Sequence, residues 1–169
     1  MTLDDVYGTR PDLLPKSMVR VVRSDQQGER RLTWVGRPGV QLLNLDQHLQ
    51  YERESLSRYP RSSDGAIEWG VVADGLVLSS MELGSIELST VVQQFAPKAG
   101  SLVFFWESLA VPSVEMGLEF SISHLPDIVE SVPEFWVYSP GGRIVVESSF
   151  SGVVTVAHIP VEVDGQSPA

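Results

Sequence analysis

Three histidines are the first candidates for chemistry in this sequence, and their spacing argues against a shared site. His48, His124 and His158 lie far apart along the chain, and none belongs to an H-x-x-x-H or H-x-E pattern. Metal sites commonly take two ligands at such short spacings. The sequence therefore predicts no metal site and no catalytic residue, and each histidine is interpreted as a surface or hydrogen-bonded structural residue unless the fold assembles a site.

Serine and glycine also form no known catalytic motif. The nucleophile of many serine hydrolases sits in a G-x-S-x-G elbow, whereas residues 139–142 (Ser-Pro-Gly-Gly) and 151–152 (Ser-Gly) are typical of turns. The segment 141–143 (Gly-Gly-Arg) lacks the Walker spacing and a following helix. It predicts a hairpin turn rather than a phosphate-binding loop.

Carboxylates are abundant, so an acid–base pair of the glycosidase type remains a possible reading. The candidate members are Glu68, Asp74, Glu107, Glu115 and Glu119. The sequence gives no distances between them, and Asp74 already has a role in an Asp-Gly turn. No D-x-D-x-D-G run predicts a calcium site, and no cofactor is predicted.

The charge is divided unequally along the chain. Residues 1–61 hold ten of the twelve Lys and Arg residues against eight acidic residues, a net charge of +2, whereas residues 62–169 hold two against fourteen, a net charge of −12. Such a negative field repels nucleic acid and anionic membranes and favours a basic partner. Five arginines near the first predicted hairpin could form an RNA-binding face, but the overall charge of −10 opposes it. They are Arg20, Arg23, Arg30, Arg31 and Arg37.

Length and composition predict one domain spanning residues 1–169, with a possible hinge or loop near 60–65 and a frayed tail at 164–169. The chain has no cysteine, which excludes disulfides and thiolate chemistry and is typical of a reducing compartment. The acidic start does not resemble a secretory signal, and the longest apolar block, residues 102–106, is far too short to span a membrane. We therefore expect a soluble cytoplasmic protein.

The elements that would position these residues are mostly strands. Hairpins are predicted at 18–23 with 30–35, at 67–72 with 76–80, and at 135–138 with 143–147, each around a turn signal. Further strands are expected at 101–107, 114–122 and 153–158. The four tryptophans, Trp34, Trp69, Trp106 and Trp136, each fall in a predicted strand and are expected in the core.

Two helices have clear signatures. The first opens at Asn44 with a capping-box pattern completed by Gln47 and ends at Pro60. The second runs from Ser85 to Pro97, with one apolar stripe at helical spacing. A third, short helix is expected at 125–132. The sequence thus predicts an α+β fold with a mostly antiparallel β-sheet, about eight strands in hairpins, and two or three helices packed on it.

Size, lack of cysteine and the acidic stretch from Asp64 to Asp164 resemble the bacterial immunity proteins that neutralise toxins. The resemblance is at the level of this class, because no family motif matches residue by residue. It implies a non-catalytic inhibitor that covers the basic active-site cleft of a nuclease or NAD-degrading toxin. Glu115 and Glu119, on the exposed face of the strand predicted at 114–122, would pair with basic residues of that partner, with Glu68, Asp74 and Glu107 nearby.

Two other classes remain open. The protein could be a small-ligand-binding protein or an enzyme whose carboxylate and histidine site is assembled only by the fold, in which case we expect a deep pocket with convergent polar groups. It could also be a phage or assembly subunit, which would form a stable homo-oligomer. The sequence specifies neither the oligomeric state nor the partner.

Overall fold

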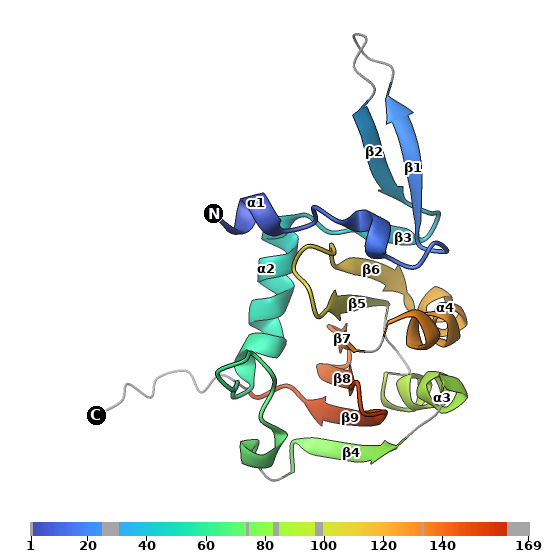
Figure 1. The fold of residues 1–169 in the computed structure, drawn as a ribbon. Coiled ribbons are helices and arrows are strands. Elements are labelled where there is room, and N and C mark those ends of the chain that lie inside the picture. The colour runs from blue at the N-terminus through green and yellow to red at the C-terminus, as the bar shows by residue number, and fades with distance from the viewer. Residues whose placement is uncertain are drawn as a thin grey trace.

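A seven-stranded sheet between helical layers forms the body of the protein (Figure 1). The computed structural model describes residues 2–24, 31–73, 75–82, 85–96, 100–132 and 134–161. Helix α2 lies against one face of the sheet, and α3 and α4 lie against the other. The α+β class with mostly antiparallel strands is confirmed, with nine strands and four α-helices in the described residues.

All strand pairs of the large sheet are antiparallel, in the order β3-β6-β5-β7-β8-β9-β4. The strands are β3 (Val40–Leu42), β4 (Val77–Glu82), β5 (Ser101–Trp106), β6 (Val114–Gly117), β7 (Phe135–Ser139), β8 (Ile144–Ser148) and β9 (Val153–His158). The helices are α1 (Leu3–Val6), α2 (Leu45–Glu54), α3 (Ser85–Phe95) and α4 (Leu118–Ser131), with 3-10 turns at Pro11–Leu13, Leu56–Arg58 and Trp69–Val71. The strands predicted at 101–107 and 153–158 and the hairpin at 135–147 are confirmed as β5, β9 and β7–β8.

The sheet has a hydrophobic core on each face. Alternate residues of β5 point to opposite sides, so Leu102 and Phe104 join the core under α3 and α4, while Val103 and Phe105 join the core on the α2 side. All four are buried. β5 is therefore buried on both faces, which accounts for its unbroken apolar and aromatic run.

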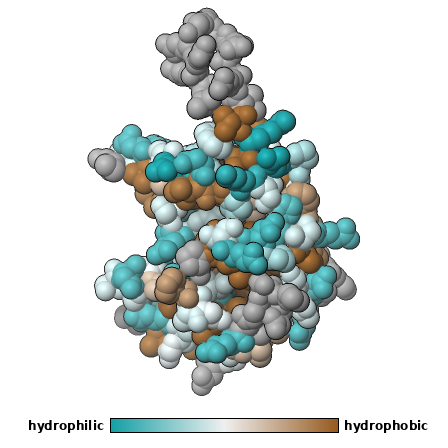
Figure 2. All heavy atoms as spheres, turned by 45° about the vertical axis from the view of Figure 1, so that its right-hand side comes forward, coloured by the Kyte–Doolittle hydropathy of each residue, from teal (hydrophilic) through white to brown (hydrophobic). Residues whose placement is uncertain are grey.

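A second, two-stranded sheet projects from the body as an arm (Figure 1). It consists of β1 (Val19–Ser24) and β2 (Arg31–Gly36), which confirms the first predicted hairpin. Met18 and Val19 are buried at its base. Apolar side chains gather around that base on the face shown in Figure 2. Hydrophobic packing at the base therefore attaches the arm to the body.

The capping box of α2 forms as predicted. Asn44 Oδ1 accepts the Gln47 backbone N–H at 2.9 Å, and Gln47 Oε1 accepts the Asn44 backbone N–H at 3.0 Å. These bonds satisfy donors that would otherwise be unpaired at the helix start. They fix where α2 begins, and hence which of its residues face the sheet.

The hairpin predicted at 67–80 is wrong. Residues 69–71 form a 3-10 turn, and β4 pairs with β9 instead of with the segment before it. Asp74, at the expected turn, lies outside the described residues. β4 pairs with β9 over more residues than it could with the 3-10 segment. Pairing with a strand far away in the sequence therefore overrides the local turn signal. The predicted hinge near 60–65 and single domain are not tested and stay predictions.

The strand predicted at 114–122 ends at Gly117, and a helix follows. Leu118, Ser121, Leu125 and Ile128 share one side at helical spacing, whereas the alternation that predicted a strand runs through residues 118, 120 and 122. The short helix predicted at 125–132 is therefore the second half of α4. Pro126 lies inside it and leaves the Ile122 carbonyl without its usual N–H donor.

A hydroxyl from α3 compensates for this proline. Ser89 Oγ donates to the Ile122 carbonyl oxygen at 3.4 Å. The bond supplies the missing partner at the place where α3 and α4 pack together.

Candidate functional site

A row of cross-strand neighbours on the α2 face of the sheet carries polar side chains. Phe105 on β5 is opposite Trp136 on β7, Trp136 is opposite Glu147 on β8, and Glu147 is opposite Thr155 on β9. Cross-strand neighbours on one face have side chains in contact distance. The row therefore places the Glu147 carboxylate between Trp136 and Thr155 on this face.

Glu147 is buried and is held by two indoles. Trp69 Nε1 donates to its Oε1 at 2.8 Å, and Trp136 Nε1 donates to its Oε2 at 2.7 Å. Only 8% of the residue is exposed. Both donors are neutral, so they solvate the carboxylate without cancelling its charge. Glu147 thus adds to the negative field on this side of the sheet.

Helix α2 contributes a buried histidine above the same face. His48 Nδ1 lies 2.7 Å from Ser113 Oγ, and Nε2 lies 3.2 Å from Glu52 Oε2. Either Ser113 Oγ or His48 Nδ1 donates this hydrogen bond, according to which ring nitrogen carries the proton. Nε2 contacts the Glu52 carboxylate and makes no hydrogen bond of good geometry with a described residue.

The Ser–His–Glu order suggests a catalytic triad, but the geometry does not provide an attacking serine. Ser113 is 1% exposed and does not line the cavity beside His48. Its backbone N–H donates to the Tyr7 hydroxyl at 2.9 Å, which fixes it in the interior. A nucleophile must reach its substrate, so Ser113 is a positioning residue that orients His48.

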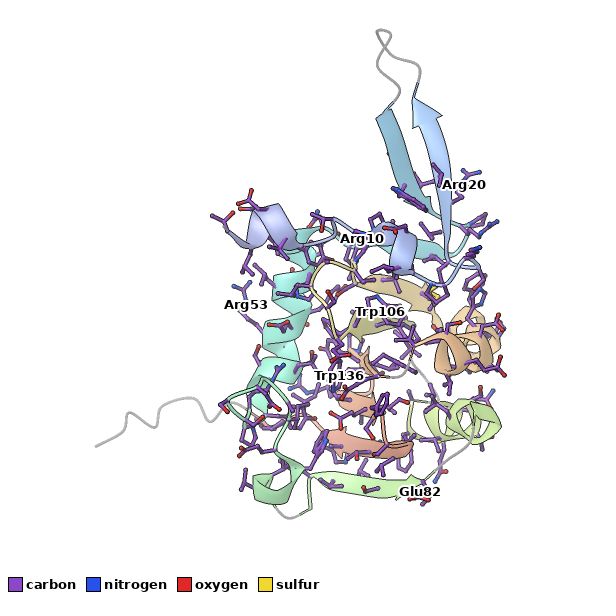
Figure 3. The ribbon with its side chains drawn as sticks, in the orientation of Figure 1. Arg10, Arg20, Arg53, Glu82, Trp106 and Trp136 are labelled. Carbon is purple, nitrogen blue, oxygen red and sulfur yellow. The ribbon has the colours of Figure 1, made fainter. Side chains whose placement is uncertain are left out.

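Beside His48 and Glu52 a cleft of about 370 Å³ opens between α2, the loop after Pro60 and the ends of β5 and β7. We name it the acidic cleft. Its lining residues are His48, Glu52, Leu56, Arg61, Asp64, Gly65, Ala66, Phe105, Trp106, Glu107, Leu109, Glu134 and Trp136. The buried members form the floor and the exposed ones the rim. Figure 3 labels Trp106 and Trp136, which lie on neighbouring strands beside it.

Four carboxylates and one cation line the acidic cleft: Glu52, Asp64, Glu107 and Glu134, with Arg61. Burial, followed by the nearby charges of Glu107, Glu147 and Asp64, raises the pKa of Glu134. Contact with His48, followed by the charge of Arg61, lowers the pKa of Glu52 in spite of its burial. Arg61 supplies one positive charge, and its Nε donates to the Gly65 carbonyl at 2.7 Å. One cation beside four carboxylates leaves the cleft with a net negative charge.

Glutamine at position 134 is expected to stabilise the protein at neutral pH. A carboxyl with a raised pKa in the folded state costs stability above that pKa, and the cost disappears below its ordinary value of 4.5. Denaturant unfolding of Glu134→Gln should therefore give a higher free energy of unfolding than the wild type at pH 7, with the difference shrinking towards pH 4.

Glu130→Gln, an exposed change on α4, is the matched control and should stay within about 0.5 kcal/mol of the wild type at both pH values. A loss of stability in Glu134→Gln at pH 7 would contradict the clustering of charges around Glu134.

The five carboxylates predicted as a binding group are dispersed. Glu107 lines the acidic cleft, and Glu68 is exposed outside it. Glu115 lies under α2, where it accepts the Tyr51 hydroxyl at 2.7 Å, and Glu119 lies in the first turn of α4. Asp74 is outside the described residues. The expectation that Glu115 and Glu119 share the exposed face of one strand is therefore wrong.

Sequence reasoning missed Glu52, Asp64, Glu134 and Glu147 as members of one group. Glu52 follows His48 by four residues on α2, so both lie on one helix face, which is a readable signal. Asp64 and Glu134 come from loops, and Glu147 lies on β8 next to the cleft residue Trp136. Their proximity depends on the pairing of β5 with β7, which no local sequence pattern specifies.

The described parts of the chain contain no group of three or more His, Asp or Glu side chains arranged to hold a metal ion. Within the same residues, no helix is both long and apolar enough to span a membrane. Comparison with protein-family models and with curated proteins finds no match to this chain.

Proposed function

We propose that the protein is a non-catalytic, cytoplasmic inhibitor of the immunity type, which neutralises a toxin enzyme by covering its basic active-site cleft. The observation that carries this proposal is the acidic cleft, which four carboxylates and one arginine line. Toxins that act on nucleic acids or NAD have anionic substrates and therefore basic clefts. Basic side chains of such a partner would relieve the repulsion that raises the pKa of Glu134.

The charge of the whole chain supports the same interaction. The net charge of −10 attracts a basic partner over several ångströms and orients it before contact. Exposed rim residues, including Glu107 and Asp64, meet the partner first. Complementary charge of this kind increases the association rate more than it changes the final affinity.

A second function, binding of a small cationic ligand, is favoured by the size of the acidic cleft. About 370 Å³ falls within the range of small-ligand pockets. The cleft provides carboxylates that could bind such a ligand. Its described lining contains no serine or threonine that could act as a nucleophile. Binding is therefore the better supported form of this alternative.

The test is affinity capture from native lysate at low and high salt, followed by an activity assay of the captured protein. We expect one basic enzyme that the wild type retains at low salt, that high salt releases, and that loses activity at an equimolar ratio. The double variant Glu107→Gln/Glu134→Gln should lower the association rate about tenfold or more.

The control Asp127→Asn/Glu130→Gln removes the same charge from exposed positions of α4, on the opposite side of the sheet. Its association rate should stay close to that of the wild type. The proposed inhibitor function would be contradicted if the captured enzyme stayed fully active. It would also be contradicted if neither high salt nor the cleft variant reduced capture.

A further inference from the structure

We propose that the β1–β2 arm binds the free edge of β4 in a second copy of this chain. The arm is a basic two-stranded ribbon, and β4 is the longer free edge of the large sheet and lies in an acidic segment. The inference does not rest on the proposed function, because neither the arm nor β4 lines the acidic cleft.

The arm leaves apolar surface in solvent. Its two strands pair with each other and with no further described strand, and Figure 1 shows them projecting from the body. Val21 is the cross-strand neighbour of Trp34, and 45% of Val21 is exposed. A two-stranded ribbon is at best marginally stable in water unless a further strand or a helix covers its apolar face. We therefore expect the arm to be covered in its working state.

β4 is the edge strand that can accept a further strand. Among the described strands it pairs with β9 alone, and its register is irregular only between Val77 and Ser79. Its outer side therefore presents unpaired backbone N–H and C=O groups, and 39% of Leu78 and 51% of Met81 are exposed beside them. The other edge strand, β3, has three residues and contacts β2 at the base of the arm. Addition of a strand to such an edge is a common mode of protein recognition.

Charge selects β4 as the partner of the arm. Residues 16–37 hold six Lys and Arg residues against two acidic ones, a net charge of +4, whereas residues 62–97 hold five acidic residues and no Lys or Arg, a net charge of −5. Arg20 on β1 and Glu82 on β4 are both exposed. Arm-to-β4 contact brings opposite charges together, whereas arm-to-arm or β4-to-β4 pairing would bring like charges together.

The fold allows this contact only between molecules. β2 contacts β3, and β4 lies at the opposite end of the sheet. With seven strands spaced about 4.8 Å apart, β3 and β4 are roughly 29 Å apart. The arm points away from the sheet, and Figure 3 labels Arg20 and Glu82 at opposite ends of the molecule. A second copy is therefore needed, and reciprocal contacts would close a dimer, whereas non-reciprocal ones would build a head-to-tail chain.

The experiment is analytical ultracentrifugation of the full chain at about 0.15 M salt, where a Debye length of about 8 Å screens repulsion between distant parts of two acidic chains. A strand-sized contact is smaller than a standard interface, so we expect reversible association with a dissociation constant on the order of 10 µM. The arm variant Arg20→Glu/Arg23→Glu and the edge variant Met81→Lys/Glu82→Lys should each weaken association at least tenfold.

The control Ser123→Lys/Glu130→Lys makes the same change of charge as the edge variant at exposed positions of α4. Its dissociation constant should stay within threefold of that of the wild type. Mixing the arm variant with the edge variant should restore association, because the first retains an intact β4 and the second an intact arm. Restoration also shows that both variants are folded.

A wild type that stays monomeric at about 200 µM would overturn the proposal, because association at the expected strength would then be nearly complete. Association that neither variant weakens, or that mixing does not restore, would also overturn it, since the contact would then not join the arm to β4. RNA is the other ligand that the charge of the arm could attract. If the wild type were monomeric and bound a single-stranded RNA 20-mer that the arm variant did not bind, the arm would be an RNA-binding element instead.

Discussion

Replacing Phe104 with alanine is expected to lower the free energy of unfolding by about 3–5 kcal/mol. Phe104 is 0% exposed at the centre of β5. Its ring lies 6.1 Å from that of Trp106 and 6.3 Å from that of Phe135, in stacked arrangements. Alanine removes these contacts and leaves a cavity that the surrounding strands can fill only in part. Denaturant unfolding followed by tryptophan fluorescence would measure the loss.

Val71→Ala is the matched control, because Val71 is 65% exposed and its truncation creates no internal cavity. It should change the free energy of unfolding by about 0.5 kcal/mol or less. A loss below about 1.5 kcal/mol for Phe104→Ala would mean that the core beneath α3 and α4 is not tightly packed around this ring.

The parts of the fold that sequence could predict are those specified locally. The capping box at Asn44, the apolar stripe of α3 and the turn at 139–143 each determine an element from adjacent residues. The wrong predictions concern segments whose structure is determined by residues far away in the sequence. β4 pairs with β9, about seventy residues later, and residues 118–122 become helical because α4 packs against α3. Local periodicity cannot distinguish these outcomes.

The acidic cleft was only partly predictable for the same reason. Excess negative charge after residue 62 is visible in the sequence, and Glu107 was one of the residues predicted to bind. Which carboxylates meet depends on strand order and on the packing of α2. Glu134 and Glu147 lie on or next to strands that the sequence had predicted, but the sequence did not give their cross-strand neighbours. Glu115 was expected to face solvent, but its carboxylate accepts a hydrogen bond from the hydroxyl of Tyr51 on α2.

Replacing Trp136 with phenylalanine is expected to cost about 2–4 kcal/mol, more than the same change at Trp106. Phenylalanine retains much of the apolar volume but removes the indole N–H that donates to Glu147 Oε2 at 2.7 Å. The buried carboxylate then keeps only the Trp69 donor. A hydrogen bond to a charged group contributes about 1.5–3 kcal/mol, and an ion left poorly solvated in the interior adds to the loss.

Trp106→Phe is a close control, because both indoles are 9% exposed and both donate one hydrogen bond. Trp106 donates to a neutral acceptor, the Pro112 carbonyl, at 2.9 Å, which is worth about 0.5–1.5 kcal/mol. Urea unfolding of the two variants therefore compares a charged with a neutral acceptor at matched volume change. Equal losses would show that Glu147 gains its stabilisation elsewhere. We expect the larger loss at Trp136, because its acceptor is the buried carboxylate of Glu147 and that of Trp106 is a neutral carbonyl.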